Sequence, residues 1–201
     1  MRILVACEFS GIVRDAFAAR GHDAWSCDLL PTERSGQHIQ GDVLEVLEDG
    51  WDMLLAFPPC TYLCSSGLHW NKRVPGREAQ THEAMLFVLD LMGEGFVSHS
   101  MPKIALENPI GRISTAYRKP DQIIQPWQFG HDASKATCLW LRGLPKLVPT
   151  AIVEPRIVGT KRIWGNQTPS GQNKLGPSPT RAADRARTYQ GIADAMANQW
   201  G

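Results

Sequence analysis

The apolar run at residues 51–56 is followed by two consecutive prolines, Pro58 and Pro59, and then by Cys60. Because proline has no backbone N–H to give to a neighbouring strand, the pair predicts a strand that leaves its sheet at this point. The prolines also stiffen the backbone that presents Cys60. A thiol on a rigid loop at the carboxyl end of a strand is well placed for a nucleophile, and a small buried cysteine after a turn is the competing interpretation.

Strand-like and helix-like patterns alternate along the chain. Strands are predicted at residues 2–7, 23–27, 51–56, 103–106 and 136–141, most of them nearly continuous apolar runs. Helical spacing of apolar residues is found at residues 12–19, 77–96 and 182–200. The pattern predicts an α/β fold with a Rossmann-like, mostly parallel sheet and helices on both faces. Residues 67–76 and 154–187 are polar and are predicted to form loops.

Glycine and acidic residues follow the predicted strands. Gly11 follows the first strand and Asp28 follows the second, which is the arrangement of a nucleotide-binding half-fold. A single glycine is a weak signal for a dinucleotide, and the pattern is compatible with a smaller adenosine ligand. Asp42 either caps a short helix at residues 43–47 or accepts a hydrogen bond from an adenine amino group.

A second polar motif, Glu107-Asn108-Pro109, repeats the layout of the Cys60 loop at the end of another strand. Carboxyl ends of neighbouring parallel strands meet at the same edge of a sheet. We therefore expect Cys60 and Glu107 to face one cleft.

Composition indicates a soluble, cytoplasmic protein. The chain is 43% apolar and 20% charged, and it contains neither a signal-like segment nor an apolar run of the roughly 20 residues that a membrane span needs. Its 201 residues suffice for a single domain. Five cysteines, an odd number, favour reduced thiols over a disulfide framework, and their spacing does not predict a metal site.

Positive charge is concentrated in one segment. Residues 154–187 hold seven Lys or Arg against two acidic residues, a net charge of +5, whereas the remaining 167 residues carry −4. A basic segment on an acidic body predicts a polyanionic partner, with a solvated loop as the alternative. We interpret residues 146–187 as a basic, loop-rich insertion in a single domain that spans residues 1–201.

Taken together, these motifs resemble those of the cytosine-5 DNA methyltransferases, in a short form like those of phages and prophages. The resemblance implies the class I methyltransferase fold. The motifs that carry it are Phe9-Ser10-Gly11, Asp28, Gly41-Asp42-Val43, Pro58-Pro59-Cys60 with Ser66-Gly67, Glu107-Asn108-Pro109 and residues 189–196.

The resemblance implies that Cys60 adds to carbon 6 of a flipped-out cytosine in double-stranded DNA and that carbon 5 is then methylated. Glu107 would contact ring nitrogen 3 and the exocyclic amine, while Asn108 and Pro59 would fix the two loops. The methyl donor would be S-adenosylmethionine. Its implied contacts are Phe9, Ser10 and Gly11 near the methionine part, Asp28 at the ribose and Asp42 at the adenine, together with Pro58 and Asp194.

The sequence departs from the family at four places. Thr61 replaces a glutamine, Ala193-Asp194 replaces Gly-Asn, and the large target-recognition domain is missing. The family's substrate-holding arginine motif is also absent, and Lys135 or Arg142 is the candidate replacement. With Ser66, Trp164 and Lys174, these two residues make up the predicted substrate-binding set.

The sequence is also compatible with two other functions. The first is modification of carbon 5 in RNA or in a free pyrimidine nucleotide, or transfer of a different one-carbon group. The second is a non-catalytic relative that binds nucleic acid or a host protein. The oligomeric state is not predicted.

Overall fold

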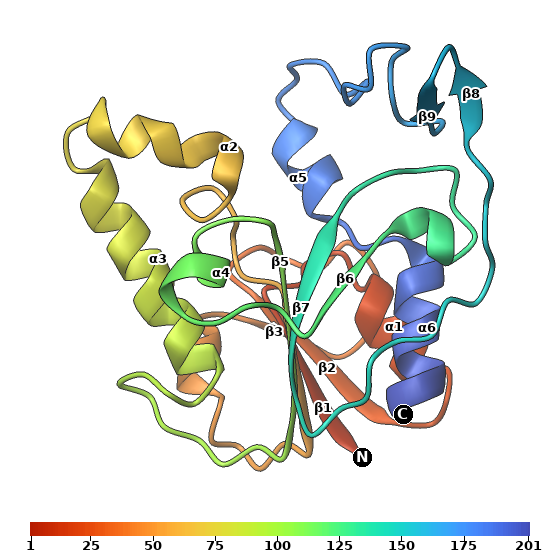
Figure 1. The fold of residues 1–201 in the computed structure, drawn as a ribbon. Coiled ribbons are helices and arrows are strands. Elements are labelled where there is room, and N and C mark those ends of the chain that lie inside the picture. Colours follow the sequence, from red (N-terminus) through yellow and green to blue (C-terminus); the bar gives the residue numbers. More distant parts are fainter.

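The computed structural model describes residues 1–201, and its centre is a seven-stranded sheet with the strand order β3-β2-β1-β4-β5-β7-β6 (Figure 1). Strand β7 runs antiparallel to β5 and β6, and the other pairings are parallel. The strands are β1 (Arg2–Ala6), β2 (Asp23–Asp28), β3 (His38–Gln40), β4 (Met53–Ala56), β5 (Lys103–Pro109), β6 (Gln122–Ile124) and β7 (Thr137–Arg142). The predicted fold class, a Rossmann-like and mostly parallel sheet, is confirmed.

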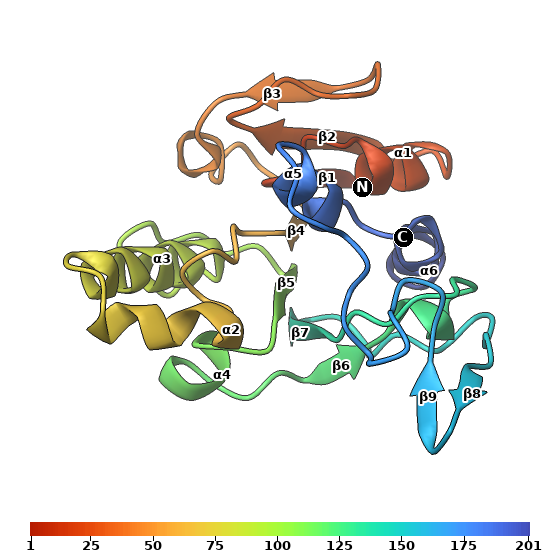
Figure 2. The ribbon, with the colours of Figure 1, turned by 90° about the horizontal axis from the view of Figure 1, so that it is seen from above.

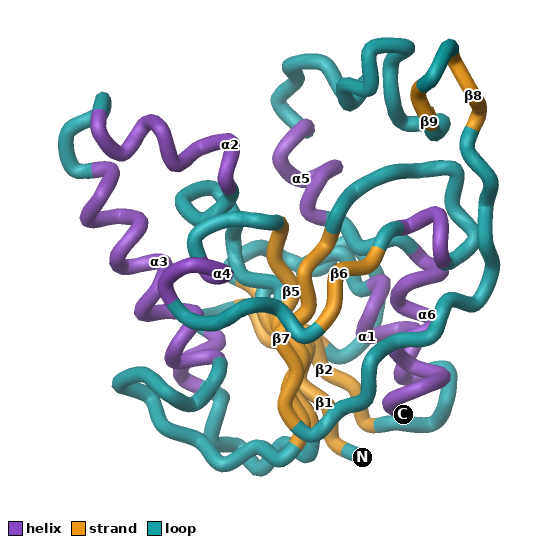
Figure 3. The backbone as a smooth tube through the Cα atoms, viewed as in Figure 1, coloured by secondary structure: helices purple, strands orange, loops and turns teal.

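Helices cover both faces of this sheet (Figures 1 and 3). One face carries α1 (Ile12–Ala18) and α6 (Gln190–Trp200), and the other carries α3 (Arg77–Leu91). The shorter helices are α2 (Ser65–Leu68), α4 (Ile113–Ala116) and α5 (Arg181–Ala186), with 3₁₀ turns η1 (Val43–Glu45), η2 (His69–Lys72) and η3 (Pro126–Gln128).

Alternate residues of each central strand enter two separate cores. In β1, Ile3 and Val5 pack with α1 and α6, whereas Leu4 and Ala6 pack with α3. All four side chains are fully buried. This two-sided burial explains why the central strands are continuous apolar runs in the sequence rather than alternating ones.

The two edge strands, β3 and β6, were not predicted. Each is three residues long and largely polar or exposed, so it gives no apolar run. The loop predicted at residues 67–76 is also wrong in part, because α2 and η2 occupy residues 65–72. These turns bury no residue, which is why apolar periodicity does not reveal them.

Both long helices of the sequence prediction are shorter in the structure. Helix α3 ends at Leu91, and Gly93 beyond it adopts a left-handed φ of 67°. The helix predicted at residues 182–200 is two helices, α5 and α6, because Arg187 and Tyr189 are extended, with ψ values of 135° and 134°. The break turns α5 away from the sheet, so that it lies above the carboxyl ends of β1 and β2 (Figures 1 and 2).

The segment predicted as a long basic loop contains a hairpin, β8 (Arg156–Val158) and β9 (Lys161–Ile163). Trp164, which follows β9, is 9% exposed and stacks on Trp127 with ring centroids 5.6 Å apart. Asn166 exchanges hydrogen bonds with the backbone of Ser134. The segment is therefore anchored to the body of the domain at its middle.

No helix combines the length and the apolar character needed to cross a bilayer. All five cysteines are free thiols, and Cys60 is the exposed one.

Candidate active site

The Cys60 loop leaves the sheet after β4 and is held from two sides. On the β5 side, the Asn108 amide donates to the carbonyl oxygen of Pro58 at 2.8 Å, and Asn108 is 1% exposed. On the α3 side, Arg77 donates to the Thr61 carbonyl at 3.1 Å and lies over the Tyr62 ring. The backbone N–H of Cys64 donates to the Cys60 carbonyl and closes a turn. The thiol of Cys60 is thus exposed on a loop whose backbone is fixed.

Glu107 lies near the end of β5, one residue beyond the Ala56–Leu106 pair that ends the β4–β5 ladder. Its side chain is only partly exposed, and burial raises the pKa of the carboxyl group. Lys135 and a hydrogen bond with Thr137 lower that pKa and offset part of the effect. A raised pKa favours the protonated carboxyl group, which can donate a hydrogen bond.

Lys135 precedes β7 and is the third side chain of the site, after Cys60 and Glu107. Its Nζ donates to the backbone carbonyl of Arg185 in α5 at 3.0 Å. The same ammonium group lowers the pKa of both Cys60 and Glu107, so it lies within electrostatic range of each. Since strand β7 is antiparallel, its first residue reaches the edge where the parallel strands β4 and β5 end.

The surroundings of Cys60 shift the pKa of its thiol in opposite directions. Burial among the surrounding protein atoms raises its pKa, and the neighbouring Cys64 and Glu107 raise it further. Lys135 and Arg185 lower it. The net effect is a raised pKa for the Cys60 thiol, because desolvation, Cys64 and Glu107 together outweigh Lys135 and Arg185.

This balance predicts opposite shifts for two variants. Lys135→Met removes a positive charge, so the thiolate of Cys60 should form only at higher pH than in the wild type. Glu107→Gln removes the charge that the carboxyl group acquires on ionisation, so the thiolate should form at lower pH. Both shifts can be measured as the pH dependence of iodoacetamide alkylation of Cys60, followed by mass spectrometry. Shifts of the same sign in both variants would contradict this electrostatic assignment.

A cavity of about 460 Å³, called here the large cavity, opens beside Pro59. Its walls come from the ends of β1 and β2, from the start of η1, from the Cys60 loop and from α3. The lining includes the acidic residues Asp28 and Asp42 and the apolar residues Leu29, Val43 and Phe87. Apolar walls with a few polar groups are typical of small-molecule sites.

Each of the two aspartates uses one oxygen for the backbone and lines the cavity as well. Asp28 Oδ1 accepts from the Leu30 N–H at 2.9 Å, and Asp42 Oδ1 accepts from the Leu44 N–H at 3.0 Å. Asp42 is therefore the cap of η1, one of its two predicted roles. The Oδ2 atoms make no hydrogen bond to the protein, so the cap leaves Asp42 able to accept from a ligand.

A second, small cavity of about 10 Å³ lies next to the large one, and Cys7 lines both. Phe9 and Ser10 line the small cavity, as does Glu8, which is not among the predicted site residues. Glu8 is 5% exposed; its Oε1 accepts from Ser10 and from the Ile12 N–H, whereas its Oε2 is buried without a partner. An unpaired buried carboxylate oxygen is costly, and a ligand ammonium group would satisfy it.

Cys7 is also absent from the predicted set. Its backbone is left-handed, with a φ of 57°, which is uncommon for a residue other than glycine. Both its N–H and that of Glu8 point at the Cys27 carbonyl, at 2.7 and 3.3 Å. No sequence signal marks this turn, because the residue types that usually signal a positive φ are missing.

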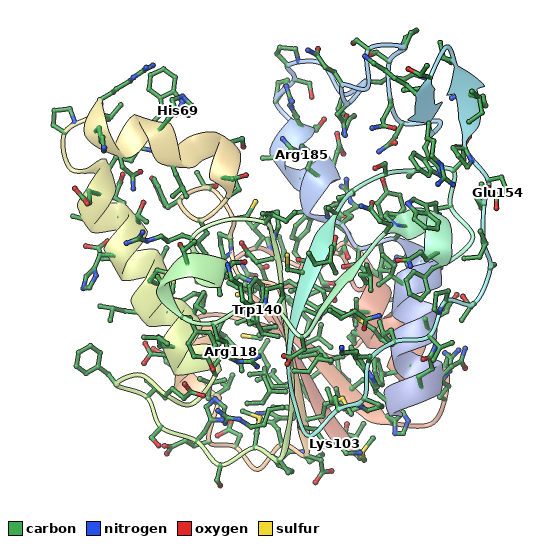
Figure 4. All side chains as sticks on the ribbon, in the orientation of Figure 1. His69, Lys103, Arg118, Trp140, Glu154 and Arg185 are labelled. Carbon is green, nitrogen blue, oxygen red and sulfur yellow. The ribbon has the colours of Figure 1, made fainter.

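The structure does not bring all predicted residues to this site. Arg142 lies away from the site, because it pairs in register with Ile104 near the start of β5 and forms an ion pair with Glu94 at 2.8 Å. The antiparallel direction of β7 places Lys135 at the active edge and Arg142 at the other. In Figure 4, Lys103 marks that opposite edge, whereas His69 and Arg185 lie above the active one.

Three further predicted residues make their contacts outside the site. Trp164 is buried against Trp127, and Lys174 donates to the Gly165 carbonyl at 2.7 Å, so both hold the basic segment together. Asp194 in α6 accepts from Gln190 and lines neither cavity.

The remaining predicted residues support the loops rather than the cavities. Ser66 is exposed near Cys64, with its Oγ 3.2 Å from the Cys64 sulfur. Pro58 is buried and contributes its carbonyl to Asn108. Gly11 has a φ of 73° and begins α1; a Cβ there would lie 2.6 Å from the Arg14 guanidinium.

Among the solved structures that this chain is similar to is the S. pombe Dnmt2 methyltransferase. The two chains are 17% identical with a TM-score of 0.42, and the match covers 73% of this chain and 50% of that one. This chain therefore spans about half the length of that structure. No protein-family model matches the sequence. No curated protein matches it either.

Proposed function

We propose that this protein transfers a methyl group from S-adenosylmethionine to carbon 5 of cytosine in DNA, through a covalent bond between Cys60 and carbon 6. The observation that carries the proposal is the meeting of an exposed thiol, a carboxyl group of raised pKa and a lysine at one sheet edge, beside a cavity lined by two aspartates. The sequence motifs at these positions resemble those of cytosine-5 methyltransferases.

The side chains fit the steps of this reaction. Carbon 5 of cytosine is a weak nucleophile, and addition of the Cys60 thiolate to carbon 6 makes it enamine-like. Burial raises the pKa of Glu107, and in its protonated form this carboxyl group donates to ring nitrogen 3 and stabilises the charge that develops there. Lys135 favours the thiolate of Cys60. After methylation, carbon 5 loses its proton to water and the Cys60–carbon 6 bond breaks, which returns the thiolate.

The groups that line the two cavities suit the proposed donor. When bound, S-adenosylmethionine supplies an electrophilic methyl group. Asp28 and Asp42 offer free carboxylate oxygens for ribose hydroxyls and for an adenine amino group, and the partnerless Glu8 oxygen offers a site for an ammonium group. Pro59 brings the large cavity next to Cys60.

Two basic segments flank the sheet edge and suit a polyanionic substrate. On one side, η2 and the residues after it carry Lys72, Arg73 and Arg77. On the other side, α5 and the β8–β9 hairpin carry exposed lysines and arginines (Figures 1 and 4). A nucleic acid that presents a base at Cys60 would contact both segments through its phosphates.

The hairpin gives a direct prediction on substrate binding. Replacing its exposed basic side chains in the triple variant Arg156→Gln/Lys161→Gln/Arg162→Gln should weaken binding to duplex DNA and flatten its salt dependence. Loss of three phosphate contacts lowers the slope of log Kd against log salt by about 3. Fluorescence anisotropy with a labelled oligonucleotide measures this slope, and Lys119→Gln, an exposed lysine outside both basic segments, serves as the control. An unchanged slope would remove the hairpin from the DNA-binding surface.

The reaction itself is tested by incubating the protein and S-adenosylmethionine with DNA that contains 5-fluorocytosine. Fluorine at carbon 5 cannot leave as a proton does, so the adduct should persist as a protein–DNA complex that survives denaturation. Parallel incubations with RNA and with 5-fluoro-dCMP distinguish the alternative substrates. If no substrate yields a complex while DNA still binds, the non-catalytic alternative is favoured.

A further inference from the structure

The small cavity is lined by an acidic and a basic side chain. Glu8 presents a buried carboxylate oxygen without a partner, and Arg187, from the extended link between α5 and α6, lines the same cavity. The Arg187 guanidinium lies over the Phe9 ring, 5.8 Å from its centroid. A carboxylate and a guanidinium beside one cavity are complementary to the ammonium and carboxylate groups of a free α-amino acid.

Arg187 already holds two carboxylates in this structure. Its Nε and Nη2 bind the two oxygens of Glu33, with 2.9 Å between Nε and Oε2, and its Nη1 binds Asp184 at 2.6 Å. Glu33 is fixed beside the cavity, because its N–H donates to the Phe9 carbonyl at 2.9 Å. The Arg187 side chain is 33% exposed and that of Glu33 39%, so the pair is accessible from solvent. A ligand carboxylate that replaces Glu33 would keep the same kind of bidentate, charge-assisted pair at Arg187.

At about 10 Å³, the small cavity has room for little more than one water molecule. The wall that has to move to admit an amino-acid group is the end of α5 and the link after it, residues 186–188, which line the cavity. In this structure, the ion pair between Arg187 and Glu33 ties that link to the segment between β2 and β3. Exchange of partners at Arg187 thus couples ligand binding to the position of α5.

We propose that Arg187 recognises the α-carboxylate of the amino-acid part of the methyl donor by exchanging Glu33 for it, while Glu8 receives the ammonium group. This inference rests on the proposed function for the identity of the ligand. It makes the small cavity an amino-acid subsite that selects adenosine ligands with an amino-acid group over those without one.

Calorimetry with two ligands tests the proposal. S-Adenosylhomocysteine carries the amino-acid group, and 5′-methylthioadenosine lacks it. Arg187→Gln should weaken the binding of S-adenosylhomocysteine by about 10- to 100-fold, the loss expected for a charge-assisted pair. Binding of 5′-methylthioadenosine should not change. Arg181→Gln, a neighbouring arginine of α5 without an ion pair, is the control and should bind both ligands like the wild type.

The variant Glu33→Gln separates recognition from a structural role. If the ligand carboxylate replaces Glu33 at Arg187, Glu33→Gln removes the carboxylate that competes with the ligand. S-Adenosylhomocysteine should then bind as tightly as in the wild type or more tightly. If the ion pair only clamps the chain, Glu33→Gln and Arg187→Gln should both weaken the two ligands alike, and the inference is overturned. Binding of both ligands with this selectivity, but without trapping by 5-fluorocytosine, would refute the proposed reaction and leave the amino-acid subsite standing.

Discussion

Cys60→Ser is expected to lower the rate of methyl transfer by at least about 10⁴-fold and to abolish the covalent complex with 5-fluorocytosine DNA. A serine hydroxyl is a far weaker nucleophile than a thiolate, and no basic side chain lies in contact with it to take its proton. Lys135 lies within electrostatic range, but its ammonium group is bound to the Arg185 carbonyl. The rate is measured as transfer of a labelled methyl group to DNA, and the complex by denaturing electrophoresis.

Cys64→Ser is the matched control for this experiment. Cys64 lies one turn after Cys60 and is partly buried, with its sulfur 3.2 Å from the hydroxyl oxygen of Ser66. A serine at position 64 keeps that polar contact, so the variant should still form the complex. If Cys64→Ser lost the complex and Cys60→Ser kept it, the assignment of the nucleophile would be wrong.

Glu107→Gln is the second large effect that we expect, a fall in the rate of methyl transfer of about 10²- to 10⁴-fold. An amide has nearly the shape of the protonated carboxyl group, but it has no acidic proton to share with ring nitrogen 3. The loss should appear in kcat, with the dissociation constant of S-adenosylhomocysteine unchanged, because Glu107 lines neither cavity. Single-turnover methylation and calorimetry measure the two quantities.

A structural explanation for the Glu107 effect can be tested with the same protein. Glu107 lies in β5 opposite Leu139 of β7, so a misfolded edge would also abolish the proposed activity. Glu107→Gln should keep the melting temperature and should make Cys60 alkylate at lower pH than in the wild type. A variant with wild-type kcat would show that the carboxyl group takes no part in the reaction.

The central strands could be predicted because burial on both faces leaves a continuous apolar run, as in β1 and β4. The Cys60 loop could also be located, since two prolines cannot continue a central strand. The edge strands β3 and β6 could not be predicted, because one side of each is unpaired and their residues are mostly polar or exposed. The break between α5 and α6 could not be predicted, because residues 181–200 contain no proline and no glycine before Gly191.

Local sequence thus determined the chemistry that the chain carries: a thiol after Pro58-Pro59, an acid and an amide before Pro109, and aspartates after the second strand and before η1. Tertiary structure alone decided which other side chains join them. The antiparallel direction of β7 brings Lys135 to the sheet edge that carries Cys60 and takes Arg142 to the other, and the extended link after α5 places Arg187 beside Glu8. Strand direction and helix breaks depend on contacts between residues far apart in the chain, such as the pair Arg187 and Glu33, and no local pattern records them.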